Sequence, residues 1–425
     1  LYVVAPLSGG PSETAGLQSG DKIIAVDDKN IAGVGLTNRQ VHENLRGEKG
    51  SEVKLKIMRS GLEEPVEFKI IRDKIPQFSV DVSYMVDDEI GYIKVSRFSA
   101  TTYNEFMEAL NKLEDQGLKK LILDLQDNPG GYMDKAISMA DEFLKDNAMI
   151  VYTKGKEKRY NSEARAIKEG KFEDSPLIVL INEGSASASE IVSGAIQDND
   201  RGLIVGRRSF GKGLVQMPVP LKDGSELRLT ISRYYTPSGR SIQKPFGEDP
   251  NEYREDMNYR YEHGEYFVAD SIQFDDSLRY TTSNGRIVYG GGGIMPDYFV
   301  PLDTAQTSTY LNRLFLSNTL RQYTFSYYEK NKKMLENMGM EGFINNFQVT
   351  DKMLNELISL AKTNNVEFNE EGFNKSKELI KLYSKAYIAR NIWNNEGFYP
   401  IFNQQNEVFL EALKLFDRAE SLAKK

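Results

Sequence analysis

The chain has 425 residues, of which 40% are hydrophobic and 27% charged, enough for two to four domains with buried cores. A formal net charge of -8 without a block of basic residues argues against nucleic acid as a partner, and no apolar run is long enough to span a bilayer. Cysteine is absent, which suits an oxidising envelope or secreted compartment, and two histidines in separate regions argue against a histidine-based triad or a zinc site.

Residues 1–73 form the first predicted domain, a small β-rich module. Alternating apolar residues predict strands at 53–58 and 66–70, and a helix is expected near 38–45. Glycines punctuate the turns between the short strands. Leu1 begins in a strand-like stretch rather than at a methionine, so we expect a signal region upstream of it.

Residues 74–303 are predicted to form an α/β core, because strands and helices alternate up to about residue 197. Strands are expected at 90–95 and 121–125, with a helix from about 101 to 116 between them. The second strand ends in Gln-Asp-Asn-Pro-Gly-Gly, a turn that can expose backbone amides at Gly131. The alternative is an ordinary connection between a strand and a helix.

A serine-rich elbow is the first chemical signal. The apolar run 177–181 predicts a strand buried on both faces, and it is followed by Asn-Glu-Gly and by Ser-Ala-Ser-Ala-Ser. Apolar residues then recur at helical spacing from Ala188 to Ile196. A serine at such an elbow presents its hydroxyl outside the sheet, close to the amides of a helix N-terminus. The alternative is that these small residues only form a turn and a helix cap.

A loop lysine is the second signal. Lys212 stands in Ser-Phe-Gly-Lys-Gly, after a predicted strand at 203–205. The stretch 206–212 fits the first part of a phosphate-binding loop, but Gly213 replaces the required Ser or Thr, and a strand-like segment follows where a helix is needed. A lysine can act as a base only when it is neutral, and its apolar neighbours Phe210, Leu214 and Val215 favour that state.

The remainder of the chain is predicted in three parts. A hairpin turns at 222–224, with Leu227, Leu229 and Ile231 alternating along its return strand. Residues 247–283 are polar and aromatic without clean periodicity, which indicates a surface insertion. Residues 304–425 form the third predicted domain, a helical one, whose three apolar stripes indicate a bundle core. The stripes begin at Met353, Leu379 and Phe409.

Three motifs in order, LDLQDNPGG, SASASE and SFGKG-x-VQ, resemble the carboxy-terminal processing proteases, also called tail-specific proteases. The string GPSETAGLQSGDKIIAVDD resembles part of a PDZ domain, so the resemblance implies an N-terminally truncated PDZ domain before a crotonase-like or Clp-protease-like α/β core. It implies that Ser187 is the nucleophile, Lys212 the general base and Gln216 the residue that orients the lysine. It places the oxyanion amides at Ala188 and Gly131.

The resemblance implies a serine endopeptidase that cleaves polypeptides at or near their C-terminal tails through an acyl-enzyme, without cofactor or metal. It further implies tail recognition by the PDZ domain, a bacterial cell-envelope location (periplasmic or surface-anchored), and as further partners a second copy of the chain and a regulatory or adaptor protein. The alternative is a catalytically silent peptide-binding scaffold of the same fold. We expect Glu190 and Asp198 to be structural, because an acid within reach of Lys212 would keep its ammonium charged.

Overall fold

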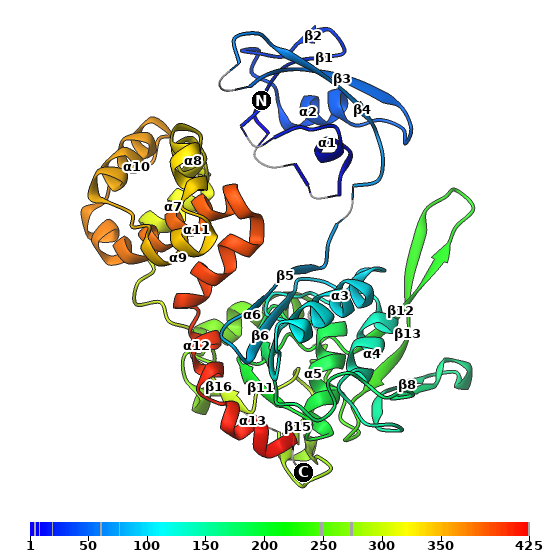
Figure 1. Ribbon diagram of the computed structural model, residues 1–425. Coiled ribbons are helices and arrows are strands. Elements are labelled where there is room, and N and C mark those ends of the chain that lie inside the picture. Colours follow the sequence, from blue (N-terminus) through cyan, green and yellow to red (C-terminus); the bar gives the residue numbers. More distant parts are fainter. Residues whose placement is uncertain are drawn as a thin grey trace. The chain divides into compact units, whose positions relative to one another are not determined.

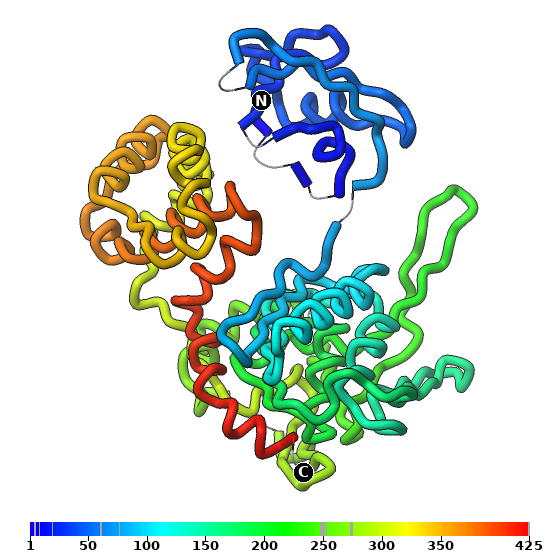
Figure 2. Tube along the Cα trace, in the orientation of Figure 1, coloured from blue at the N-terminus to red at the C-terminus, as the bar shows by residue number. Residues whose placement is uncertain are grey.

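A computed structural model describes residues 1–3, 6–7, 9–18, 20–59, 62–75, 77–246, 250–272 and 275–423. The chain forms two compact units, Leu1–Gln77 with Ala305–Phe402, and Phe78–Thr304 with Asn403–Lys425 (Figures 1 and 2). Residues 247–249 and 273–274 of the predicted insertion lie outside the described residues. Among the helices in the described ranges, none is both long and apolar enough to cross a membrane.

The N-terminal part of the first unit is a four-stranded antiparallel sheet with two helices. The strands are ordered β2–β1–β3–β4, and their bounds are β1 Lys22–Val26, β2 Lys29–Asn30, β3 Glu52–Met58 and β4 Val66–Ile71. The helices are α1, Pro11–Thr14, and α2, Asn38–Leu45. Helix α2 begins at Thr37, whose hydroxyl accepts from the Gln40 amide while the Gln40 side chain accepts from the Thr37 amide.

The rest of the first unit is a bundle of five helices. Their bounds are α7 Thr309–Leu316, α8 Thr319–Asn337, α9 Met340–Asn346, α10 Asp351–Thr363 and α11 Glu370–Phe402. The first predicted stripe lies on α10, where Met353, Leu354, Leu357 and Ala361 are buried in the bundle core. Helix α11 is interrupted at Trp393 and Asn394, whose backbone angles are not helical.

The second unit is built on a six-stranded sheet of order β16–β11–β10–β7–β6–β5. The strands are β5 Val80–Met85, β6 Ile90–Val95, β7 Lys120–Asp124, β10 Leu177–Ile181, β11 Leu203–Gly206 and β16 Tyr298–Phe299. All neighbours pair in parallel except β5 and β6, so the sheet matches the predicted α/β class. The central strand β10 is fully buried because helices cover both faces of the sheet.

Different parts of the chain supply these helices (Figure 1). One face packs against α3, Thr102–Asp115, α4, Met133–Asp141, and α5, Ala188–Asp198. Helices α12, Glu407–Leu413, and α13, Phe416–Ala423, pack against β10 and β11. The third predicted stripe is therefore buried on this unit and not in the helical bundle, so the helices predicted within 304–425 are divided between the two units. An apolar stripe predicts burial, but it does not identify the surface that covers it.

The second unit also contains a four-stranded sheet of order β12–β13–β8–β9. Its strands are β12 Leu214–Pro220, β13 Glu226–Tyr235, β8 Met149–Gly155 and β9 Ser162–Arg165. The β12–β13 hairpin extends beyond the body of this unit (Figure 1). The apolar residues that alternate along β13 do not form a buried face in this hairpin, since Leu227 and Leu229 are 51% and 50% exposed.

The predicted surface insertion is partly buried. It contains helix α6, Pro250–Glu262, 3-10 turns at Ala269–Ser271 and Asp276–Leu278, and strand β14, Arg279–Thr281, which pairs with β15, Ile287–Tyr289. Arg260, Glu265, Tyr266 and Ile272 are all buried. The segment shows no apolar period in the sequence although parts of it are buried, because charged groups are buried here as ion pairs.

Candidate active site

Ser187 stands at the sharp turn between strand β10 and helix α5. Its backbone angles are φ 56° and ψ -111°, a region that non-glycine residues seldom adopt. Such strain at a strand-to-helix turn is typical of a nucleophile elbow, which lifts the side chain away from the sheet. The side chain is half-buried, and the predicted helix begins directly after it at Ala188.

The three serines of the elbow have different environments. Ser185 is fully buried and donates to the Leu125 carbonyl at 2.8 Å, and Ser189 is fully buried and donates to the Asn128 carbonyl at 2.9 Å. Both hydroxyls therefore fasten the elbow to the turn that follows β7. Ser187 belongs to the lining of a cavity that neither Ser185 nor Ser189 lines.

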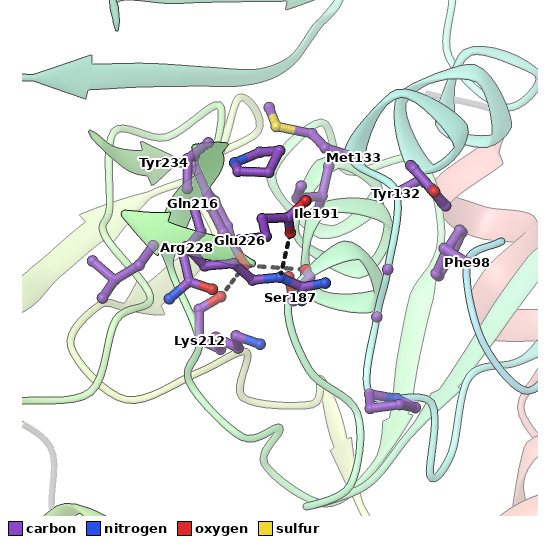
Figure 3. A pocket seen from close by; sticks show the side chains of 16 residues that line it. Phe98, Tyr132, Met133, Ser187, Ile191, Lys212, Gln216, Glu226, Arg228 and Tyr234 are labelled. Atoms are coloured by element: carbon purple, nitrogen blue, oxygen red, sulfur yellow. Dashed lines mark hydrogen bonds and ion pairs between the residues drawn. The ribbon is translucent and has the colours of Figure 1, made fainter. Parts of the chain in front are cut away.

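That cavity has a volume of about 710 Å³. Its lining includes four of the predicted site positions, Ser187, Lys212, Gln216 and Gly131. In the view of Figure 3, Ser187 lies between one side formed by Phe98 and Tyr132 and another formed by Lys212, Gln216 and Arg228. The remaining lining residues are Pro129, Gly130, Met133, Ile191, Leu214, Val215, Pro218, Glu226 and Tyr234.

Lys212 is carried by the segment Ser209–Gly213, here called the base loop, which leads into β12. The lysine is half-buried, and Gln216 is exposed at a β-bulge between Val215 and Gln216. Such a bulge re-aims the side chains that follow it. Within the described part of the chain no hydrogen bond joins the Ser187 hydroxyl, the Lys212 amine and the Gln216 amide, so the structure gathers these groups without linking them.

The predicted oxyanion amides come from two segments that touch. Gly131 has φ 146°, and a Cβ atom there would meet the Phe98 carbonyl oxygen at 2.0 Å. Phe98 accepts from the Tyr132 amide at 2.8 Å, which leaves the Gly131 N–H without an acceptor in the described residues. A Cβ atom on Gly130 would lie 2.8 Å from the Ala188 nitrogen, whose N–H likewise has none there. Only glycines allow this close approach.

Glu190 connects the elbow to the base loop. Its buried carboxylate accepts from the Ser187 amide at 2.7 Å and the Lys212 amide at 2.9 Å through Oε2. Its Oε1 accepts from the Gly211 amide at 2.7 Å and the Ser209 hydroxyl at 2.6 Å. Burial raises the pKa of Glu190, although these four donors favour the charged form. One carboxylate thus fixes the main chain at both candidate catalytic residues.

Tyr234 makes a second connection between the same two residues. Its buried hydroxyl lies 3.0 Å from the Ser187 carbonyl and 2.5 Å from the Lys212 carbonyl (Figure 3). Burial, together with the charge of Glu190, raises the pKa of Tyr234 well above its usual range, so the phenol is a neutral donor. Strand β13, which carries Tyr234, thereby holds the two segments together from the side of the second sheet.

The sequence analysis predicted a structural role for Glu190 but not its hydrogen bonds to the base loop, and it did not identify Tyr234. The pattern Ser-x-x-Glu from Ser187 to Glu190 is a capping signal and could have pointed to the contact with the elbow. The other three hydrogen bonds of the Glu190 carboxylate join it to the base loop, about 20 residues further along the chain, and a local sequence pattern does not reveal them. Asp198, also predicted to be structural, forms a fully buried ion pair with Arg240 at 2.8 Å.

These features define a chain with an α/β core that carries a serine elbow and a small β-rich N-terminal module. Residues 89–253 match peptidase family S41, and residues 2–59 match the PDZ domain. Residues 310–394, within the helical bundle, match a family of unknown function, DUF8443. The chain therefore carries an S41 peptidase domain preceded by a PDZ domain, and the family inferred from its motifs is confirmed.

The chain is a relative of the carboxy-terminal processing proteases. It is 42% identical over 247 residues to the carboxy-terminal-processing protease of Bartonella bacilliformis, covering 57% of this chain and 56% of that protein. It is 40% identical over 252 residues to the carboxyl-terminal-processing protease of Synechocystis, covering 57% of each. It is 35% identical over 289 residues to carboxy-terminal processing protease CtpB of Bacillus subtilis, covering 67% of this chain and 57% of that protein.

The matched part spans a little over half the length of these relatives. Among solved structures, a photosystem II D1 C-terminal processing protease is 31% identical, with a TM-score of 0.36, covering 57% of this chain and 65% of that one. An S41 protease from Bacteroides fragilis, described as putative in its structure's title, is 18% identical, with a TM-score of 0.41 and 69% coverage of both chains.

Proposed function

We propose that this chain is a serine endopeptidase that cleaves polypeptides at or near their C-terminal tails. The observation that carries the proposal is the elbow serine. Ser187 has a strained backbone and faces a cavity of about 710 Å³ that it shares with Lys212 and Gln216, while both flanking serines are buried. A scaffold that only binds peptides needs neither the strain nor the lysine.

The first half of the reaction forms an acyl-enzyme. Lys212, as a neutral amine, accepts the proton of the Ser187 hydroxyl, and Oγ attacks the carbonyl carbon of the scissile peptide. The N–H groups of Ala188 and Gly131 donate to the oxyanion that forms. The ammonium of Lys212 then returns the proton to the departing amine as the C–N bond breaks, and the N-terminal part of the substrate stays esterified to Ser187.

The second half removes the acyl group. Lys212, neutral again, accepts a proton from water, and the hydroxide attacks the ester carbon while the same two amides hold the oxyanion. The C–O bond to Ser187 breaks, and the proton on Lys212 returns to Oγ. Gln216 orients the amine of Lys212 during both halves. Neither half consumes a co-reactant other than water.

Tail recognition is assigned to the PDZ domain. This domain has a cavity of about 620 Å³ with apolar lining from Ile23 of β1, Val41 and Leu45 of α2, and Leu55 of β3. A groove between a helix and a sheet suits an extended peptide that adds as a strand and places alternate side chains in apolar pockets. The proposed ligand is the exposed C-terminal tail of a polypeptide substrate.

The proposed location is the bacterial cell envelope, periplasmic or surface-anchored. It is supported by bacterial relatives of the same kind and by the absence of cysteine from the chain. Fractionation of cells that express the full-length protein tests the location.

The catalytic proposal is tested by mass spectrometry of peptide digests with the parent chain and with Ser187→Ala. We expect cleavage near peptide C-termini by the parent chain and none by the variant, which should stay folded, because alanine at a helix start costs at most about 2 kcal/mol. Absence of cleavage by both, with tail peptides still bound, would replace the proposal by a peptide-binding scaffold. Loss of activity in Ser189→Ala but not in Ser187→Ala would place the nucleophile elsewhere in the elbow.

A further inference from the structure

Helix α6, at the start of the predicted insertion, contacts the base loop through a buried arginine. Arg260, in the last turn of α6, is 2% exposed. Its Nη1 donates to the Ser209 carbonyl at 3.1 Å, and its Nη2 donates to the Arg208 carbonyl at 2.8 Å. These carbonyls belong to the chain that leads into Lys212, so one planar guanidinium fixes two consecutive peptide groups of this segment.

An ion cluster holds Arg260 in this position. Its Nε donates to Glu265 at 2.7 Å, and Glu265 also accepts from Arg208 at 2.6 and 2.5 Å. Burial lowers the pKa of Arg260, with the charge of Arg208 as a further cause. Buried ion pairs of this kind contribute little net stability, so we infer that the cluster serves to fix the position of the Arg260 guanidinium.

A second contact joins α6 to the same loop through Lys244. Its backbone amide donates to the Gly211 carbonyl at 2.9 Å, and its ammonium lies 4.2 Å from the ring centroids of both Phe210 and Tyr253. The ammonium also donates to the Tyr253 carbonyl at 3.0 Å and pairs with Asp256 at 3.1 Å. The lysine thus ties α6 to Phe210 of the base loop.

Besides its main-chain bonds to Ser185 and Ile294, the base loop is held by two sets of partners that use different groups. Glu190 accepts from the loop's donors, the amides of Gly211 and Lys212 among them, whereas Arg260 and the Lys244 amide donate to its carbonyls. Glu190 belongs to the helix that follows the nucleophile. Arg260 and Glu265 lie beyond the residues 89–253 that match the peptidase family model.

We propose that Arg260 is a positioning residue for Lys212, and that the segment from α6 to Glu265 acts as a clamp on the base loop. The inference rests on the proposed function and adds a part to it. Without the guanidinium, the carbonyls of Arg208 and Ser209 lose this donor, and the loop that carries the amine is held less firmly. Misplacement of a catalytic group by about 1 Å can cost about 100-fold in rate.

Arg260 is not among the residues that line the cavity, so its loss should act on the chemical step and not on substrate binding. We expect Arg260→Gln to lower kcat at least about tenfold and to leave KM within about twofold. A residue with only a structural role would lower the melting temperature and the fraction of active protein, but it would not change kcat per active site. Active sites are therefore counted by titration with a fluorophosphonate that labels Ser187.

Arg201→Gln is the matched control. Arg201 is 7% exposed and, like Arg260, donates to main-chain carbonyls, those of Phe143 at 2.8 Å and Ser175 at 2.6 Å, which lie outside the base loop. We expect this variant to lose stability with kcat per active site within about twofold of the parent chain. Equal kcat values for the two variants, or a change in KM alone for Arg260→Gln, would overturn the clamp.

The proposed function and the clamp fail in different ways. If the parent chain cleaves no peptide and takes up no fluorophosphonate, the proposed function fails. If the parent chain is active and Arg260→Gln matches it in kcat, only the clamp fails. Should Arg260→Gln not fold, Arg260→Lys decides instead. It keeps the charge beside Glu265 but cannot reach both carbonyls, and a kcat equal to that of the parent chain would reject the clamp.

Discussion

The elbow that carries Ser187 and the loop that carries Lys212 are fixed in different ways. The elbow lies between a buried strand and a helix, and its flanking serines bond to the turn that follows the neighbouring strand β7. The base loop has no regular structure, and besides main-chain bonds to Ser185 and Ile294 its backbone is held by Glu190, Arg260 and the Lys244 amide. The nucleophile is placed mainly by the strand and the helix on either side of it, whereas the base lies on an irregular loop that relies more on single contacts, several of them from side chains elsewhere in the chain. Glu190 supports both segments.

This difference predicts where the site is fragile. A change near the elbow should act mainly on stability, because the sheet and helix α5 keep their places. A change around the base loop should act mainly on rate, because a small shift of the amine is enough to lose proton transfer. The predictions below test this contrast, from the largest expected effect to the smallest.

Lys212→Arg should abolish peptide cleavage, with a loss of about 1,000-fold or more in kcat. Guanidinium keeps its proton at any working pH and cannot act as a base, although it preserves the positive charge. The measurement is hydrolysis of a short fluorogenic peptide, with the exposed Lys222→Arg at the hairpin tip as the matched control. Activity near that of the parent chain would mean that position 212 supplies charge, and the serine-lysine dyad would have to be abandoned.

Glu190→Gln should lower kcat about 100-fold. The amide nitrogen of glutamine would face two hydrogen-bond donors, either the amides of Ser187 and Lys212 or the Ser209 hydroxyl with the Gly211 amide, and would push the two segments apart. Steady-state kinetics with the fluorogenic peptide, corrected by active-site titration, measures the effect. An unchanged kcat would show that this carboxylate is dispensable for placing the base.

The same variant tests the electrostatics of the site. Because burial raises the folded-state pKa of Glu190 above its unfolded value, the native state binds the extra proton between these two values. The stability contributed by Glu190 is then fully present below the unfolded pKa and is lost as pH rises through the folded one. The excess of the parent chain's unfolding free energy over that of Glu190→Gln should therefore fall as the pH rises above the ordinary pKa of a glutamate. An excess that grows with pH in denaturant titrations would contradict this direction.

Gln216→Ala should be milder, with a loss of about 10- to 100-fold in rate, or about 1.4 to 2.7 kcal/mol. Gln216 is exposed in the free structure and makes no hydrogen bond to Lys212 among the described residues, so its contribution is confined to the complex with substrate. Met217→Ala is the control, because the next residue of β12 is absent from the lining of the cavity. Equal activities of the two variants would remove Gln216 from the site.

The same contrast explains which parts of the site were predictable. The elbow was readable because an apolar run, small residues and a helical period follow one another locally in the sequence, whereas the choice of Ser187 among its three serines came from the family resemblance. Lys212 was found through its motif. Its supports were not, because Glu190 and Arg260 reach the base loop only after folding. An acidic residue in the first turn of a helix looks like a cap wherever its carboxylate is directed.

The fold shows the same limit. The parallel sheet follows from unbroken apolar strands that alternate with helices, and strands β6, β7, β10 and β11 were predicted close to their observed bounds. The insertion was predicted as surface because it is polar and aromatic without clean periodicity, and sequence alone does not show that Arg260 and Glu265 pair within it. The stripe at Phe409 was assigned to a bundle, whereas Phe409 packs against Tyr92 of β6 with 5.4 Å between ring centroids. The sequence pattern of a segment thus predicts whether it is buried better than it predicts which other segment it packs against.

The smallest change in rate is expected at the elbow, for Ser189→Ala. Its hydroxyl is fully buried and donates to the Asn128 carbonyl at 2.9 Å, so its removal should cost about 1 to 2 kcal/mol of unfolding free energy. We expect kcat to stay within about twofold of that of the parent chain, because the sheet and helix α5 still hold Ser187.

Denaturant titration and active-site-corrected kinetics, run beside Ser187→Ala, make the comparison complete. Ser187→Ala should lose all cleavage with little change in stability, whereas Ser189→Ala should lose stability with little change in kcat. A fall in kcat for Ser189→Ala as large as that for Arg260→Gln would mean that the elbow also depends on single side-chain bonds. The distinction between a nucleophile placed mainly by its flanking strand and helix and a base that relies more on single contacts would then be lost.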